Sequence, residues 1–501
     1  MPESHKQRTL RGINWNFLRV FSQTSLGLVV GVVLARLLPP SDFGLLAVAM
    51  VFISFAELVS DLGMGSSIIR LKVVEEAHIK IATTFSLLMG SLLVALLWTI
   101  AQPAAEFFGR PQVADMLRVL SVGLWFTAIS AVSRGLLLRR LDFKYLVRVD
   151  ISAYLFGYAV VAISLALAGF GVWSLVLGST ASALVTALAL LYLSPPKFTF
   201  SLPRREVREL LSFGSGMSLI VSINFISNNV DSIIIGRFLS PALLGLYSRA
   251  MQLCTMPLNR IAATISAVMF PSFAEIRDDR ERLKESYLKL VNVIALVSFP
   301  LLAGLAMGAK FVIIGLYGEN WQGASDVLRI LAVAGMIKVV TNMAAPIVQA
   351  TGHPYAEVRR QLLSLLVMSL GCLGLVRYGI EGASWAVVIS SLVFYVSMAQ
   401  LAGKILGSSW KEFIKAQFPG LAVAAAVVFA QFLVMILLNH LAPLAAPLVL
   451  VILIMISAIT SLLCVLYLPT RIVGNMPVWL ALNYGHRVPP MLRRWFARRY
   501  S

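Results

Sequence analysis

Charged side chains interrupt several long apolar runs of this sequence, and most of them are cations. Where an apolar run spans a membrane, a charge at its centre costs roughly 2.5 to 3.5 kcal/mol, so each one that is kept there is a candidate functional group. The cations are Arg19, Arg249, Arg260 and Lys338, and the acids are Asp61 and Asp231. Guanidinium and ammonium groups donate hydrogen bonds to phosphate and carboxylate, so a hydrated cavity lined by them would bind an anion.

Two of the apolar runs carry a stripe of polar residues on one helical face. The residues fall at i, i+3, i+7 in the first run and at i, i+4, i+7 in the second: Asn16, Arg19 and Gln23, and Asn224, Asn228 and Asp231. Such spacings place side chains on one side of a helix. We expect the two stripes to face each other across a central, watered cavity.

A third polar face is predicted in the apolar run after Pro241. At about 100 degrees per residue, Arg249, Gln252 and Asn259 share one face of a helix, and Arg260 is one step around it. Arg19 and Arg249, which lie nearest to the middle of their runs, are the better candidates for contact with a ligand.

Four charged groups in the apolar runs also have a structural interpretation. Lys338 could form an ion pair with Asp231, and Asp231 and Asp61 could instead be sites for a coupling ion. Arg118 and Arg329 lie near the ends of their runs, where a long side chain reaches the interface.

Composition identifies the setting as a membrane. Of the 501 residues, 59% are hydrophobic and only 13% are charged, whereas about a quarter of the residues of a soluble domain are charged. Hydropathy predicts an all-α integral membrane protein with about fourteen spans. Their approximate ranges are 13–35, 43–60, 81–101, 114–134, 149–168, 171–193, 211–235, 242–270, 288–308, 325–349, 360–377, 382–402, 418–438 and 445–467.

The distribution of positive charge predicts the orientation. Lys and Arg are concentrated in alternate connections and in both terminal segments, while the other connections hold only Arg36, Arg110, Arg237, Lys310 and Arg377. Cytoplasmic loops of membrane proteins carry the excess of Lys and Arg. We therefore expect a multi-pass membrane protein with both termini in the cytoplasm, and the net charge of +19 needs no nucleic acid to explain it.

One phrase occurs twice in the chain. Residues 35–50 read ARLLPPSDFGLLAVAM and residues 236–251 read GRFLSPALLGLYSRAM, with every matched pair 201 residues apart. This offset covers six predicted spans, an even number, so both copies have one orientation, as in parallel repeats. The expected fold is two pseudo-symmetric six-helix lobes around a central cationic cavity, followed by two C-terminal helices. The predicted domains are 1–200 and 201–404 for the lobes, 405–468 for the added helices and 469–501 for a basic tail.

Several enzyme and cofactor motifs are absent from the sequence. It contains no GxxxxGK[ST], HExxH or CxxC, and its three cysteines lie in apolar runs. We therefore expect no cofactor, no metal and no catalytic residue.

Two long segments carry a resemblance to a known family. LARLLPPSDFGLLAVAMVFISFAELVSDLGMGSSIIR and VDSIIIGRFLSPALLGLYSRAMQLCTMPLNRIAATISAVMFPSFAEI, with YGENW at 317–321, resemble the polysaccharide-transporter (Wzx-type) branch of the multidrug/oligosaccharidyl-lipid/polysaccharide exporter superfamily. This resemblance implies a transporter that flips undecaprenyl-diphosphate-linked oligosaccharides to the periplasmic leaflet by alternating access. It also implies a polysaccharide polymerase and a chain-length regulator as partners.

Two other functions remain open. A multidrug/cation antiporter of the same superfamily would present acids and aromatic rings to its substrate, whereas arginine dominates here. A membrane glycan polymerase or ligase would be expected to carry a large outer loop, and the longest predicted here has about 17 residues, around 308–324.

Overall fold

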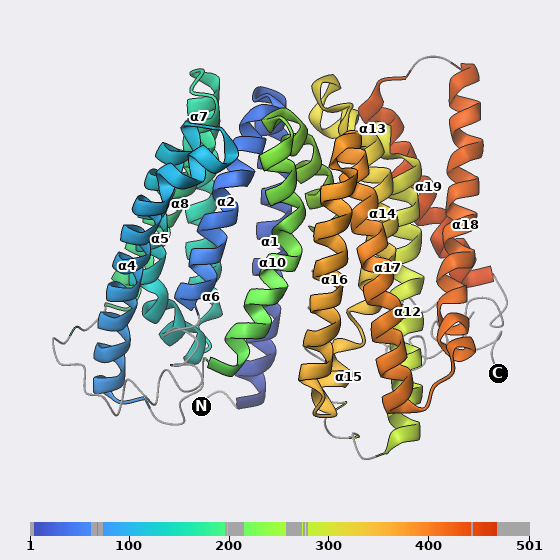
Figure 1. The fold of residues 1–501 in the computed structure, drawn as a ribbon, viewed down its shortest axis with the longest axis horizontal. Coiled ribbons are helices and arrows are strands. Elements are labelled where there is room, and N and C mark those ends of the chain that lie inside the picture. Colours follow the sequence, from blue (N-terminus) through green and yellow to red (C-terminus); the bar gives the residue numbers. More distant parts are fainter. Residues whose placement is uncertain are drawn as a thin grey trace. The chain divides into compact units, whose positions relative to one another are not determined.

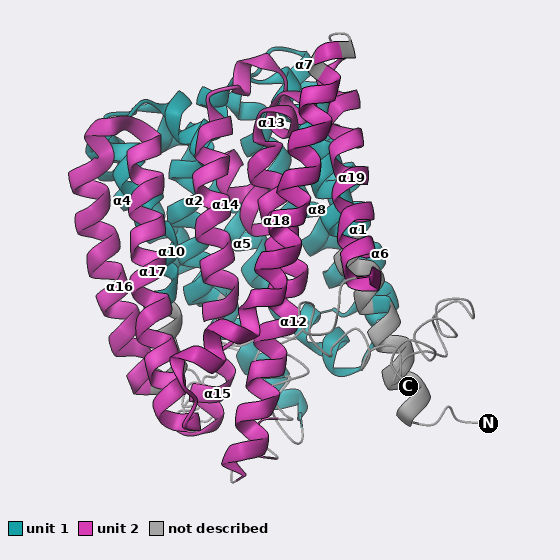
Figure 2. Ribbon diagram, turned by 90° about the vertical axis from the view of Figure 1, so that its right-hand side faces the viewer, with its two compact units in different colours: residues 1–248 teal, residues 249–501 magenta. Residues whose placement is uncertain are grey.

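The fold is known from a computed structural model, which describes residues 5–61, 68, 74–195, 198, 215–256, 273, 276, 279–441 and 444–467. Regular structure in these residues is entirely helical. The chain divides into two compact units, residues 1–248 and residues 249–501, which are coloured separately in Figure 2. The prediction of an all-helical protein is confirmed.

Unit 1 is built from the first set of helices in the chain (Figure 1). Their bounds are α1 (His5–Leu37), α2 (Pro40–Asp61), α4 (Glu76–Phe108), α5 (Gln112–Arg139), α6 (Phe143–Ser152), the π-helix η1 (Ala153–Ala159), α7 (Val160–Leu167), α8 (Val172–Leu193) and α10 (Ser215–Phe238). Helix α5 packs against α2, α4 and α8, and α10 packs against α2 and α4. Helix α10 therefore belongs to the first compact unit, although it lies beyond the predicted repeat boundary at residue 200.

Unit 2 holds a second set of helices. Their bounds are α12 (Arg280–Met307), α13 (Ala309–Tyr317), η2 (Glu319–Trp321), α14 (Ala324–Thr341), α15 (Ala345–Ala350), α16 (Pro354–Leu375), η3 (Val376–Tyr378), α17 (Gly379–Leu406), α18 (Trp410–Leu441) and α19 (Ala446–Tyr467). Residues 241–256 are also helical and run across the boundary between the units.

The last two helices, which the sequence suggests are additions, pack closely in unit 2. Helix α18 lies along α12, and α19 packs against α13 and α18. A Cβ built on Gly420 of α18 would overlap the carbonyl group of Ala295 on α12, so the two backbones touch. The Asn292 amide donates to the carbonyl oxygen of Ala416 at 2.9 Å, which satisfies a polar group inside this contact.

Each predicted span has a helix in the described residues, but the count of fourteen spans stays a prediction. Ten described segments are long and apolar enough to cross a membrane, and one of them, Tyr355–Leu406, joins α16 and α17. The C-terminal part of α1 contributes a shorter apolar stretch, Ser22–Leu37. The chain is thus a multi-pass membrane protein.

The two copies of the repeated phrase meet within unit 1. A Cβ built on Gly44 would overlap the carbonyl oxygen of Pro241 and lie 2.6 Å from its carbonyl carbon. A Cβ built on Gly245 would overlap the carbonyl oxygen of Pro40 and lie 2.7 Å from its carbonyl carbon. Equivalent residues of the two copies exchange roles, as they do about a two-fold axis. We call this reciprocal contact of Pro40, Gly44, Pro241 and Gly245 the glycine clasp.

The clasp continues into the contact between α2 and α10. A Cβ on Gly236 would lie 3.1 Å from Cγ2 of Val48, and the rings of Phe55 and Phe225 are 5.5 Å apart between centroids. Helix–helix contacts in membranes depend on such close backbone approach, because lipid supplies no hydrophobic drive for helix association. The small residues of the repeat are therefore needed for α10 to lie on α2.

We predict that Gly44→Ala and Gly245→Ala each destabilise the protein by about 1–3 kcal/mol, because the new methyl group would overlap backbone atoms that cannot rotate away. The measurement is thermal unfolding of the purified protein in detergent. Gly374→Ala is the matched control, because a Cβ at that helical position meets no atom within 4 Å. The double variant should lose less than the sum of the single losses, since both changes strain one contact. Unfolding of Gly44→Ala at the temperature of the control would contradict the clasp.

Candidate functional site

Asp231 is buried in unit 1, with 3% of its surface exposed, on α10. The hydroxyl of Tyr247 donates to Oδ2 at 2.5 Å, and the backbone N–H of Ser232 donates to Oδ1 at 2.7 Å. Tyr247 is itself fully buried. A carboxylate kept out of water requires such donors, so Tyr247 is a structural partner of the predicted acid.

Sequence reasoning did not select Tyr247, although the repeat carries a signal for it. In the first copy the matching residue is Leu46, so the second copy has gained a hydroxyl at a buried position. Arg249 is a similar departure, because Val48 stands at its place in the first copy. Polar replacements within an apolar repeat mark the positions where the two halves have different tasks.

The rest of the α10 stripe uses its amide groups locally. The exposed Asn228 donates to the backbone carbonyl of Asn224 at 2.8 Å, and Asn224 is half-buried. Gln23, its repeat partner on α1, is half-buried as well. That the stripes of α1 and α10 line one cavity stays a prediction.

Arg249 lies at the start of unit 2 and is half-buried. Its Nη1 donates to Oε1 of Gln252 at 2.6 Å, so the two residues predicted on one face are in contact. This bond orients the guanidinium group by a residue one turn further along the helix.

Tyr317, in the connection between the spans of α12 and α14, responds to the charge of Arg249. Burial raises the pKa of the Tyr317 phenol, and the positive charge of Arg249 acts to lower it. Tyr317 and Trp321 are both buried, with ring centroids 5.4 Å apart. The YGENW segment thus holds two packed aromatic rings, one of which lies close enough to Arg249 for its charge to affect the phenol.

The other cations differ in their surroundings. Lys338 is half-buried on α14, in a different unit from Asp231, and their pairing stays a prediction. Arg118 and Arg329 each form an ion pair of 2.7 Å with an aspartate three residues earlier, Asp115 and Asp326 respectively. These two arginines are exposed and neutralised locally, which accounts for them without a ligand.

Five predicted site residues lie outside the part of the chain whose side chains the structure describes. They are Asn16, Arg19 and Asp61, for which only the helical backbone is described, and Asn259 and Arg260. Their roles stay predictions. Within the described residues, no three His, Cys, Asp or Glu side chains gather as a metal site would require.

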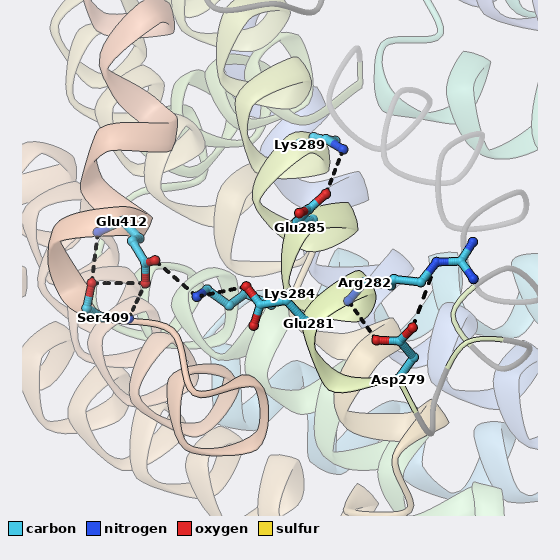
Figure 3. Close-up of polar contacts among 8 residues, drawn as sticks. All are labelled: Asp279, Glu281, Arg282, Lys284, Glu285, Lys289, Ser409 and Glu412. Atoms are coloured by element: carbon cyan, nitrogen blue, oxygen red, sulfur yellow. Dashed lines mark hydrogen bonds and ion pairs between the residues drawn. The ribbon is translucent and has the colours of Figure 1, made fainter.

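A separate charged cluster joins α12 to the start of α18 (Figure 3). Lys284 Nζ lies 3.1 Å from a carboxylate oxygen of Glu412 and 3.5 Å from one of Glu281. Glu412 also accepts from the Ser409 backbone N–H at 2.8 Å, which caps α18. Only 16% of the Lys284 side chain is exposed, so this pair fixes the helices and is not a free cationic site.

Sequence comparisons identify the family of the chain. The chain matches the polysaccharide biosynthesis protein family over residues 33–326, more than half of its length. It is 27% identical over 437 residues to the lipopolysaccharide biosynthesis protein WzxC of Escherichia coli (strain K12), covering 82% of this chain and 84% of that one. It is also 27% identical over 452 residues to the succinoglycan biosynthesis transport protein ExoT of Rhizobium meliloti (strain 1021), covering 88% of both.

The fold is shared with known membrane transporters. The lipid II flippase MurJ, in an inward closed conformation, superposes with a TM-score of 0.73 over 90% of this chain and 98% of that one, at 15% identity. A multidrug resistance MATE family transporter in an inward-facing conformation follows at a TM-score of 0.60 and 19% identity, covering 77% and 96%. At these identities the likeness concerns the fold.

We predict that Tyr247→Phe destabilises the protein by roughly 1–2 kcal/mol, since it leaves the buried Asp231 carboxylate with one donor fewer. Thermal unfolding measures the effect. Tyr192→Phe is the matched control, because that tyrosine is 86% exposed. If both variants unfold like the wild type, the Tyr247–Asp231 bond does not contribute to stability.

Proposed function

Because the chain belongs to the family of polysaccharide biosynthesis proteins, we propose that it flips undecaprenyl-diphosphate-linked oligosaccharides from the cytoplasmic to the periplasmic leaflet. The observation that carries this proposal is the family match over residues 33–326, together with the relative ExoT, which is named as a succinoglycan biosynthesis transport protein. The protein acts as a transporter and not as an enzyme.

The charges of the candidate site suit this substrate. A diphosphate bears about two negative charges and a polar sugar chain, and both need a hydrated path lined by donors. Arg249, Arg19, Arg260 and Lys338 are the cations proposed to meet the diphosphate. Asn16, Gln23, Asn224, Asn228, Gln252 and Asn259 are the amides proposed to meet sugar hydroxyls. The polyprenyl tail is apolar and remains in the lipid, so it does not need the polar path.

The membrane potential assists transport in the proposed direction. Moving negative charge outward across an inside-negative membrane gains about 2.3 kcal/mol per charge for each 100 mV. This drive needs no nucleotide, in keeping with the absence of a phosphate-binding loop from the sequence. A coupling ion bound at Asp231 or Asp61 would add a second drive.

Alternating access assigns a task to the glycine clasp. We place the clasp at the outer end, since the charge distribution along the chain puts its turn on the side poor in Lys and Arg. Backbone contact there excludes a sugar chain, so the clasp would close the outer end of the path and separate when that end opens. In the proposed topology the protein lies in the bacterial inner membrane with both termini in the cytoplasm. A polymerase and a chain-length regulator would act on the product after it reaches the periplasmic leaflet.

Two alternative functions are supported to different degrees. The MATE fold is a specific observation in favour of a multidrug/cation antiporter. That function needs acids facing the substrate, whereas Asp231 is buried and hydrogen-bonded to Tyr247. A glycan polymerase or ligase is disfavoured by the relative ExoT, which is named as a transport protein.

We predict that liposomes containing the protein flip a fluorescent undecaprenyl-diphosphate oligosaccharide, and faster under an inside-negative potential. Arg249→Ala and Arg19→Ala should each slow flipping roughly tenfold, about 1.4 kcal/mol, since each removes a charge-assisted contact. Arg329→Ala is the matched control, because Arg329 is exposed and paired with Asp326. Expulsion of cationic dyes without flipping would establish the antiporter, and glycosidic-bond formation would establish an enzyme.

We predict that Asp231→Asn or Asp61→Asn abolishes the dependence of flipping on an ion gradient. An amide keeps the size of the side chain but loses the charge that binds a cation. The experiment compares flipping with and without an imposed proton or sodium gradient, at constant potential. If both variants retain the wild-type dependence, neither aspartate couples an ion, and the potential alone is left as the drive.

A further inference from the structure

Arg110 is held in the turn that ends α4. Gly109 adopts the left-handed conformation with φ of 64°, and the Arg110 backbone N–H donates to the carbonyl of Ala105 at 2.9 Å. The guanidinium folds back so that Nη1 donates to the Gly109 carbonyl at 3.3 Å. Its Nε is buried and has no hydrogen-bond partner among the described residues. A buried N–H of a charged group is costly to leave unpaired.

Arg237 approaches the same end of α4 from the last turn of α10. Its guanidinium carbon lies 5.4 Å from the centroid of the Phe107 ring, and Phe107 packs edge-on against Phe108 with centroids 4.9 Å apart. Gly236 permits this approach, because a Cβ there would lie 3.1 Å from the Phe108 ring. A guanidinium laid on an aromatic face keeps the N–H groups at its edge free to donate.

Neither arginine is neutralised by a carboxylate among the residues that the structure describes. The nearest acid in the sequence, Glu106, accepts a hydrogen bond from Gln102 at 3.1 Å. The ion pairs of Arg118, Arg134 and Arg329 show how arginines elsewhere in the chain meet acids at 2.7 to 2.9 Å. The Arg110–Arg237 pair is therefore a concentration of uncompensated positive charge.

The position of this charge is also unusual. The predicted outer connections contain only five Lys or Arg, and three of them, Arg36, Arg110 and Arg237, belong to the ends of α1, α4 and α10 in unit 1. A cation at a helix C-terminus interacts favourably with the helix dipole, which explains one such residue. The helix dipole does not explain why Arg110 Nε is buried or why the Arg237 guanidinium lies over the Phe107 ring.

We propose that Arg110 and Arg237 form a binding site for the diphosphate of a lipid-linked substrate at the outer end of unit 1. This inference rests on the proposed function and assigns a second anion site to it, distinct from the residues of the predicted central cavity. The planar guanidinium groups of the half-buried Arg110 and the exposed Arg237 match the oxygens of a diphosphate. The site would hold the headgroup as it leaves the path.

Protection of individual arginines from phenylglyoxal tests the site directly. The full chain is placed in phosphatidylcholine nanodiscs, and labelling of each arginine is quantified by mass spectrometry. Undecaprenyl diphosphate in the nanodisc should slow labelling of Arg110 and Arg237 roughly tenfold. Arg377 is the internal control, since it is an exposed arginine 4.9 Å from the ring of its neighbour Tyr378, on the same predicted side.

The lipid arms of this experiment separate the possible sources of phosphate. Soluble pyrophosphate should also protect the pair, because the diphosphate is the recognised group. Phosphatidylglycerol, which has one phosphate, should protect it much less. Equal protection by phosphatidylglycerol would overturn the assignment to a diphosphate, and unchanged labelling with undecaprenyl diphosphate would overturn the site.

Variants distinguish recognition of the diphosphate from a role of these charges in stabilising the helix ends. Arg237→Lys keeps the charge at the end of α10 but cannot form the planar fork, so we expect it to lose most of the protection of Arg110. A helix-dipole role would leave that protection intact. In the flipping assay, Arg110→Gln/Arg237→Gln should be slower than Arg377→Gln. If the wild type does not flip but the pair is still protected, the proposed function fails while the site stands.

Discussion

The contact between the two copies of the repeat determines where α10 lies in unit 1. Gly44 and Gly245 touch carbonyl groups of the opposite copy, so the helix ends at Pro40 and Pro241 lie at backbone distance. With the turn seated there, α10 lies along α2 and reaches α4, and Asp231 comes within reach of Tyr247. A side chain at either glycine would move α10, and with it each polar group that α10 carries.

In an apolar environment, the partner of each charged group indicates whether that group serves packing or is available to a ligand. Arg134 pairs with the buried Asp150 at 2.9 Å, and Lys284 pairs with Glu412, so these charges serve packing. Arg280 donates to two carbonyls at the end of α17, Lys404 and Ile405. Against this pattern, Arg110 meets a backbone carbonyl and Arg237 an aromatic ring, and neither meets a carboxylate among the described residues, which leaves capacity for an anion.

The sequence predicted the elements well and their long-range contacts poorly. Apolar length placed a helix at each predicted span, because the bilayer requires one hydrogen-bonded segment per crossing. The repeat predicted the turns at Pro40 and Pro241, but not that they touch, since internal symmetry does not say how far apart its two halves lie. Tyr247 was missed because its partner Asp231 is reached only after the chain reverses direction. The packing of α18 on α12 has no counterpart in the repeat.

Helix α10 carries Arg237 in its last turn and leads directly to Pro241 of the clasp, so a movement of α10 would affect both. Gly236 touches Val48 of α2 and Phe108 of α4, and the next residue is Arg237 on Phe107. Separation of α10 from α2 would therefore change the distance between Arg237 and the turn that holds Arg110. A ligand that bridges the two arginines binds one arrangement more tightly than the other, and it must shift the equilibrium of the clasp by that difference in affinity. Release of the headgroup and closure of the outer end would then be coupled, so that each favours the other.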